Sequence, residues 1–136
     1  MSGFHFRLQA LLDHRSSVET KLRTEAAAHE AAQVEGKARL DCLAGELKKC
    51  DRAADLRSRA LREEYLQRAI ASESRILQDA EAALDAARVR LREAARQRLA
   101  LERLRERRWK AHLDARETAE EEELDESNLR YHSRAR

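Results

Sequence analysis

Apolar side chains recur at alternating steps of three and four residues in two separate stretches of this chain. Such steps place side chains along one face of an α-helix and are typical of a coiled-coil seam. The first predicted seam contains Phe4, Leu8, Leu11, Arg15, Val18, Leu22, Glu25, His29, Ala32 and Gly36 and, after a stutter near Gly36, Leu40, Leu43, Leu47, Cys50 and Ala54. The second contains Leu66, Ile70, Glu73, Leu77, Ala80, Leu84, Ala87, Leu91, Ala94, Arg98 and Leu101. This spacing indicates long helices that pack through a narrow face.

The two seams do not lie on one straight helix. The step from Cys50 to Leu66 rotates a helix by about 160° beyond whole turns, almost to its opposite face. We therefore predict a helix over residues 4–50, a turn over residues 51–59 and a second helix over residues 60–131, with Asp55 or Ser58 available as its cap. The expected fold is all-α, a two-helix antiparallel coiled-coil hairpin that forms a single domain over residues 1–136. The last part of the second helix is expected to project beyond the N-terminus.

One antiparallel register of this hairpin places large side chains opposite small ones. It brings Leu22 beside Ala87 and Ala32 beside Leu77. In the same register Phe4 and Phe6 lie near Trp109, so that most of the aromatic residues gather at one end of the hairpin. A helix that continues past residue 112 then has no partner helix, and its exposed Leu113, Leu124, Leu129 and Tyr131 could serve a partner protein.

Composition supports helices and argues against other architectures. Ala, Leu, Arg, Lys and Glu make up 90 of the 136 residues, proline is absent and glycine occurs three times. Strands and tight turns therefore lack their usual residues. With 40% charged residues, the chain has too little apolar surface for a wide globular core. It also lacks a stretch of about 18 apolar residues that could span a bilayer, so we expect no membrane insertion and a cytoplasmic location.

Motifs for common catalytic chemistry are missing from the sequence. The three glycines form no phosphate-binding loop, and the zinc-type opening His29-Glu30 has Gln33 where a second histidine ligand is required. A two-helix fold also offers no enclosed pocket that would shift the pKa of an acid or a base. We therefore expect no enzyme activity, no cofactor and no metal.

Charge is the strongest surface feature of the sequence. Residues 88–110 contain ten basic and three acidic residues, whereas residues 117–136 contain three basic and seven acidic residues. The basic stretch could bind phosphates, which leaves a nucleic-acid-binding rod as one alternative. An acidic protein partner fits at least as well, because arginine pairs with carboxylates in a bidentate manner. A generic coiled-coil adaptor, assembled as a parallel dimer, is a further alternative.

Both ends of the sequence resemble a known family. The start, Phe4-His-Phe6-Arg-Leu8 followed by Leu11-Leu12, is similar to the start of the flagellar export protein FliJ family. The stretch after Trp109, with Glu121-Glu-Glu-Leu124-Asp125-Glu126, resembles the acidic Leu-Asp-Glu segment near the C-terminus of that family. The length and the two-helix plan are also similar.

The resemblance implies a stalk component of the bacterial flagellar type III protein export apparatus. Such a protein binds the export ATPase hexamer and couples it to the cytoplasmic domain of the large export gate protein and to export chaperones. It would be a monomer when free, would be peripherally associated with the inner membrane at the flagellar base, and would not be expected to bind nucleic acid. The equivalent stalk protein of a virulence type III secretion system is the close alternative.

Two sets of contact residues follow. The resemblance and the basic shaft together give an ATPase-ring set of Phe4, Phe6, Leu8, Leu11, Leu12, Arg103, Arg105, Arg107, Arg108, Trp109, Leu124, Asp125 and Glu126. For the export gate, the resemblance implies an apolar stripe with an aromatic residue early in the second helix, represented by Tyr65, Leu66, Ala69, Ile70 and Leu77.

Overall fold

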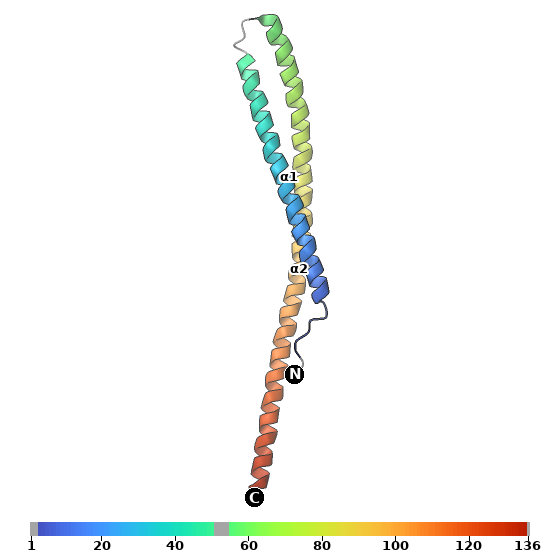
Figure 1. Ribbon diagram of the computed structural model, residues 1–136, viewed down its shortest axis with the longest axis vertical. Coiled ribbons are helices and arrows are strands. Elements are labelled where there is room, and N and C mark those ends of the chain that lie inside the picture. Colours follow the sequence, from blue (N-terminus) through green and yellow to red (C-terminus); the bar gives the residue numbers. More distant parts are fainter. Residues whose placement is uncertain (1–2, 51–54, 136) are drawn as a thin grey trace. The chain divides into compact units, whose positions relative to one another are not determined.

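The computed structural model describes residues 3–50 and 55–135, and these residues form two long helices. Helix α1 spans Gln9–Cys50 and helix α2 spans Leu56–Arg134 (Figure 1). The described residues contain no strand, and the two helices pack against each other, which confirms the predicted all-α helical hairpin. Residues 51–54 of the predicted turn, with seam position Ala54, lie outside the described residues.

The chain divides into two compact units, and both helices contribute to each. The first, called here the paired unit, is Ser17–Ala95. The second, called here the end unit, combines Met1–Ser16 with Arg96–Arg136. Each unit is considered separately below.

In the paired unit, α1 packs against α2 through an unbroken heptad seam. The buried and half-buried residues of α1 that form this seam follow each other at strictly alternating steps of four and three. They are Leu22, Ala26, His29, Gln33, Gly36, Leu40, Leu43, Leu47 and Cys50. The predicted positions Glu25 and Ala32 are exposed, and the predicted stutter near Gly36 does not exist. The apolar pattern of the sequence did not include Gln33 in the seam, because glutamine is polar. Its amide nitrogen instead donates a hydrogen bond to the Glu81 carboxylate across the seam, at 3.4 Å.

The seam predicted for the second helix is confirmed. Leu66, Leu84 and Ala87 are each 1% exposed, and the other predicted positions from Ile70 to Leu101 are buried or half-buried. Leucines alternate with alanines along this face, and small residues allow two helices to approach closely.

The register differs from the prediction by four residues, about one helical turn. Leu77 lies opposite Gly36 rather than Ala32, and a Cβ atom added to Gly36 would be 3.2 Å from Leu77 Cδ1. The absent side chain of Gly36 therefore makes room for Leu77. Across the same seam, Arg39 Nε lies 3.2 Å from a Glu73 carboxylate oxygen, so this register also pairs charges at the edge of the seam.

Asp55 caps the start of α2, as one of the two predicted caps. Its carboxylate accepts hydrogen bonds from the Arg57 backbone N–H at 3.2 Å and from the Ser58 hydroxyl at 2.7 Å. The Ser58 bond, followed by the Arg57 bond, holds the pKa of Asp55 below its usual value of 3.8. Because the cap satisfies the first amides of the helix, α2 begins at Leu56 and not near residue 60 as predicted.

Neither α1 nor α2 carries, within its described residues, an apolar stretch long enough to cross a membrane.

Candidate functional site

In the end unit, the chain that precedes α1 is not helical. Residues 3–6 are irregular, residues 7–8 form a turn, and the Gln9 N–H donates a hydrogen bond to the Phe6 carbonyl at 3.0 Å. The predicted first helix, by contrast, started near residue 4. The difference arises because Phe4 and Phe6 direct their side chains against α2, and Phe6 is only 4% exposed. Burial of these aromatic side chains outweighs one more turn of helix.

An aromatic cluster forms where this segment meets α2. The ring of Phe4 meets that of Trp109 edge to face, with centroids 5.0 Å apart and planes at 73°. His112 joins them at 5.6 Å from Phe4 and 5.8 Å from Trp109. The guanidinium carbon of Arg108 lies 5.8 Å from the centroid of Phe6, within the range of a cation–π interaction. The predicted proximity of Phe4 and Trp109, far apart in the sequence, is therefore confirmed.

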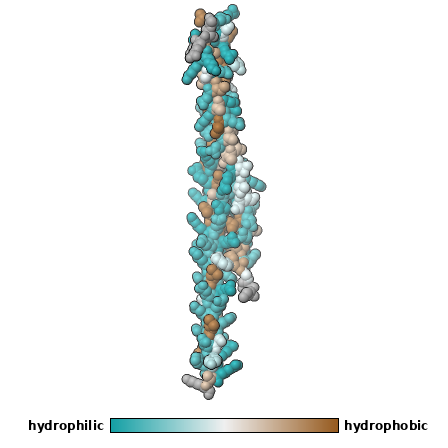
Figure 2. Space-filling model, turned by 60° about the vertical axis from the view of Figure 1, so that its left-hand side comes forward, coloured by the Kyte–Doolittle hydropathy of each residue, from teal (hydrophilic) through white to brown (hydrophobic). Residues whose placement is uncertain are grey.

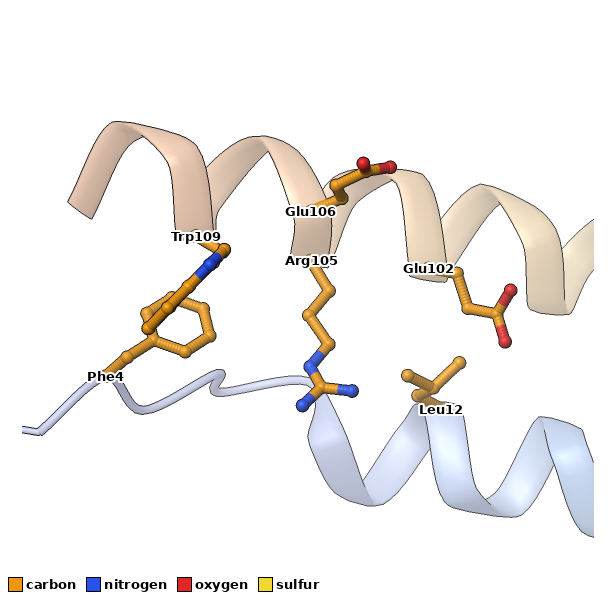
Figure 3. Close-up of a pocket in the computed structure, with 6 residues that line it drawn as sticks. All are labelled: Phe4, Leu12, Glu102, Arg105, Glu106 and Trp109. Atoms are coloured by element: carbon orange, nitrogen blue, oxygen red, sulfur yellow. The ribbon is translucent and has the colours of Figure 1, made fainter. Parts of the chain in front are cut away.

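A groove of about 440 Å³ opens beside this cluster. It is lined by Phe4, Leu12, Glu102, Arg105, Glu106 and Trp109 (Figure 3). In Figure 3, Arg105 extends from α2 toward the start of α1, while Glu106 points away from the groove. Glu102 pairs with Arg98 at 2.7 Å and Glu106 pairs with Lys110 at 3.7 Å. Arg105 makes no ion pair within the described residues, so its guanidinium is available to a carboxylate of a partner.

A second groove of about 720 Å³ continues along α2 from the same two aromatic rings. Its lining consists of Gly3, Phe4, Trp109, His112, Ala115, Arg116, Ala119, Glu120 and Glu123. Because the side chains of Ala115 and Ala119 are small, they leave space between the larger residues that line this groove. We refer to the two grooves together as the aromatic groove. With 43% of Trp109 exposed, the groove offers an aromatic surface beside charged groups, which is typical of protein-binding sites.

The structure unites part of the predicted ATPase-ring set. Phe4, Phe6, Leu12, Arg105, Arg108 and Trp109 meet at the aromatic groove or at the Phe6 ring beside it. Leu8 is half-buried at the start of α1, and Leu11 is 40% exposed. The exposed Arg103 and Arg107 are on α2 but line neither groove.

Leu124, Asp125 and Glu126 line neither groove, although Glu123, which precedes Leu124 in the sequence, is the last residue that lines the second groove. They follow Trp109 by at least 15 residues in the same helix, which corresponds to about 22 Å. They belong to a segment of α2 that we call the tail, residues 113–134, in which every residue is exposed. In the tail, at the lower end of Figure 2, apolar side chains on the visible face stand singly among hydrophilic ones.

Sequence reasoning did not assign His112, Ala115 or Ala119 to the site. A signal for all three exists, since the heptad spacing of the second seam, extended beyond Leu101, passes through residues 112, 115 and 119. Because these three side chains are polar or small, the apolar pattern ends before them, although all three line the second groove.

No family model, curated protein or solved structure matches this chain.

The predicted export-gate set, in the paired unit, divides into two groups. Leu66 is 1% exposed and Leu77 packs against Gly36, so both support the hairpin itself. Tyr65 is 70% exposed. Two further exposed apolar residues on the same side of α2, Leu61 and Ile76, are 65% and 49% exposed. They were missed, because the sequence-based stripe followed the seam and not the face beside it.

Among the described residues, no group of three or more His, Cys, Asp or Glu side chains is placed to hold a metal ion.

Proposed function

We propose that this chain is a stalk component of the bacterial flagellar type III export apparatus and that its aromatic groove binds the ring of the export ATPase. One observation carries the proposal. Phe4 and Phe6 belong to the N-terminal segment that resembles the FliJ family, and Trp109 precedes the C-terminal segment that does. In the end unit Phe4 contacts Trp109, and both line an exposed groove. Residues so distant in sequence meet there only because the chain folds back.

The chemistry of the groove suits a protein partner. Tryptophan and arginine are the residues that most often dominate protein interfaces, since they combine a large contact area with directional hydrogen bonding. Here Trp109 is fixed on one edge by Phe4, so little side-chain entropy is lost when its other face is covered. The guanidinium of Arg105, which makes no ion pair with a described residue, adds a site for an acidic side chain of the ring.

A stalk without catalytic groups acts through differential binding. If it binds one conformation of the ATPase ring more tightly than the others, it shifts the ring toward that conformation by the difference in binding free energy. The proposed result is stimulation of ATP hydrolysis and stabilisation of the hexamer, with no chemical step on this chain.

For the export gate, we place the contact on the exposed face of Leu61, Tyr65 and Ile76 rather than on Leu66 and Leu77. This change follows from burial, because a side chain that is 1% exposed is not accessible to a partner. The binding of export chaperones and the peripheral association with the inner membrane belong to the same proposal.

The first experiment measures ATP hydrolysis by the purified export ATPase with increasing amounts of this protein. We expect stimulation, and we expect the variant Phe4→Ala/Trp109→Ala to require at least about tenfold more protein for half-maximal stimulation, as for the loss of an interface hot spot. Tyr65→Ala, in the other unit, is the matched control and should stimulate normally. Circular dichroism of each variant checks that the hairpin is retained.

Absence of stimulation by the unaltered protein would overturn the proposal, and so would a normal response to Phe4→Ala/Trp109→Ala. A parallel titration with a virulence-system ATPase separates the flagellar from the virulence stalk, since the correct ring should respond at the lower protein concentration.

The gate contact is tested by affinity measurement with the cytoplasmic domain of the export gate protein. Tyr65→Ala/Ile76→Ala should weaken binding, while Phe4→Ala/Trp109→Ala should not. The opposite pattern would place the gate contact at the aromatic groove instead.

A further inference from the structure

One face of α2 in the end unit separates its charges by sign. Steps of three and four residues connect its members, so that they lie along one side of a continuous helix. In chain order they are Leu99, Arg103, Arg107, Lys110, Asp114, Glu117, Glu121 and Leu124, all exposed. The face, which we call the segregated face, thus carries three cations, then three anions, with a leucine at each end.

The charges on this face differ from those elsewhere on α2. Other side chains of the same helix form ion pairs four residues apart, for example Arg116 with Glu120 at 3.1 Å and Arg130 with Glu126 at 3.4 Å. On the segregated face, neighbours within each half have the same sign. Like charges at this spacing destabilise a helix by about 0.2–0.5 kcal/mol per pair.

The helix itself does not compensate these charges. Arg103, Arg107, Asp114, Glu117 and Glu121 make no ion pair with another described residue. Lys110 pairs with Glu106, at 3.7 Å, and not with Asp114. Five of the six charges therefore have no ion pair among the described residues, and the segregated face presents both signs in a fixed order over about 38 Å of helix.

This order is complementary to its own reverse. When a second α2 lies antiparallel with a twofold axis near residue 112, Arg103 faces Glu121, Arg107 faces Glu117 and Lys110 faces Asp114, each pair occurring twice. Leu99 then lies beside Leu124 of the other copy at both ends of the contact. A parallel arrangement would instead place cations on cations and anions on anions, which costs free energy.

We propose that the segregated face binds a second copy of this chain in the antiparallel orientation and forms a salt-sensitive dimer. This proposal departs from the monomer that the resemblance implied. The hairpin closes the apolar seam within one chain, but the segregated face lies outside that seam. Surface ion pairs are weak individually, so the dimer exchanges with monomer. The proposal does not rest on the function proposed above, but it has a consequence for it. Arg103, Arg107 and Leu124 belong to the predicted ATPase-ring set, so a dimer and a ring-bound chain would exclude each other.

Sedimentation velocity of the full chain under reducing conditions tests the dimer. We expect dimers at about 0.05 M salt that dissociate at about 0.5 M, where the screening length falls to a few ångströms. Arg103→Glu/Arg107→Glu and Glu117→Arg/Glu121→Arg should each raise the dissociation constant at least tenfold. An equal mixture of the two variants should recover the dimer, because every reversed pair is complementary again. This recovery also shows that both variants are folded.

Glu122→Arg/Glu123→Arg is the matched control. It makes the same change in net charge as the acidic-side variant but lies off the segregated face, so it should dimerise as the unaltered chain does. Three results would overturn the proposal: a monomer at low salt and high protein concentration, a dissociation constant that neither charge reversal changes, or a mixture of the two variants that stays monomeric.

Orientation is tested by disulfide crosslinking after Cys42→Ser and Cys50→Ala. Chains with Leu99→Cys should crosslink to chains with Leu124→Cys in a mixture, while each alone should crosslink poorly. Efficient crosslinking of Leu99→Cys chains to each other would indicate a parallel dimer and would contradict the proposal.

Discussion

The paired unit and the tail are built from similar residues but are supported by different forces. In the paired unit, Leu66 and Leu84 are each 1% exposed against the other helix. In the tail, Leu124 and Leu129 are 64% and 69% exposed, and no residue is buried. Both are helical, which shows that helix formation here is a local property, whereas burial depends on a partner helix.

Local interactions account for the helix of the tail. Alanine, glutamate and arginine favour helix by intrinsic propensity, and the ion pairs Arg116–Glu120 and Glu126–Arg130 each add a few tenths of a kcal/mol. In the paired unit, apolar burial adds about 25 cal/mol for each Å² removed from water. A partner of the tail therefore needs to supply a contact surface but does not need to induce helix formation.

Amide hydrogen exchange should show the largest difference between the two regions. Amides of the paired unit near Leu66 and Leu84 should exchange only through global unfolding, while tail amides exchange through local fraying. We expect protection to differ by at least about a thousandfold. The measurement is made at about 0.5 M salt, so that the proposed self-association is screened. Equal protection in both regions would mean that another surface covers the tail.

A pair of leucine truncations should give the next largest difference. Leu84→Ala should lower the free energy of unfolding by about 2–4 kcal/mol, because it leaves a cavity in the seam. Leu124→Ala should change it by less than about 0.5 kcal/mol, since that side chain is exposed. Urea denaturation followed by circular dichroism measures both, and similar losses would contradict the described packing.

The cap of α2 should give a smaller, pH-dependent effect. Because the pKa of Asp55 is lowered in the folded state, its stabilising contribution is present above the unfolded-state pKa and is lost as the pH falls through the folded-state value. Asp55→Ala should therefore lower the thermal midpoint at about pH 6, and this difference should shrink at about pH 2. A pH-independent difference would argue against the carboxylate as the stabilising group.

Alanine substitutions at two glycines of α1 should show the smallest difference in the free energy of unfolding. Gly45 has open space where a Cβ would lie, so Gly45→Ala should stabilise the protein by about 0.5–1 kcal/mol through helix propensity. Gly36→Ala makes the same local gain, but its Cβ would lie 3.2 Å from Leu77 Cδ1. We expect its net effect to be less favourable than that of Gly45→Ala. An equal gain in stability at both positions would indicate that the Leu77 side chain can move away from the added Cβ at little cost in free energy.

Several features could be predicted from the amino-acid sequence: the helical hairpin, the seam of the second helix, a cap at Asp55 or Ser58, and the meeting of Phe4 with Trp109. The seam and the cap follow from local rules, whereas the meeting of Phe4 with Trp109 follows from antiparallel pairing and tolerated the four-residue error in register. Heptad spacing sets the buried face of a helix, the absence of proline removes internal breaks, and a carboxylate before a helix satisfies its first amides. The second seam was predictable because most of its members are leucine or alanine.

The phase of the first seam, the register and the accessible part of each predicted contact set depend on packing between the two helices. Glu19, 5% exposed, and Gln33 are polar side chains on the buried face, where hydropathy favours their neighbours Val18 and Ala32. The register depends on whether Gly36 or Ala32 gives Leu77 more room, and this fit across two helices leaves no trace in the spacing of either one. For the same reason the sequence assigned both Tyr65 and Leu66 to one contact, although burial against the opposite helix leaves only Tyr65 of this pair accessible.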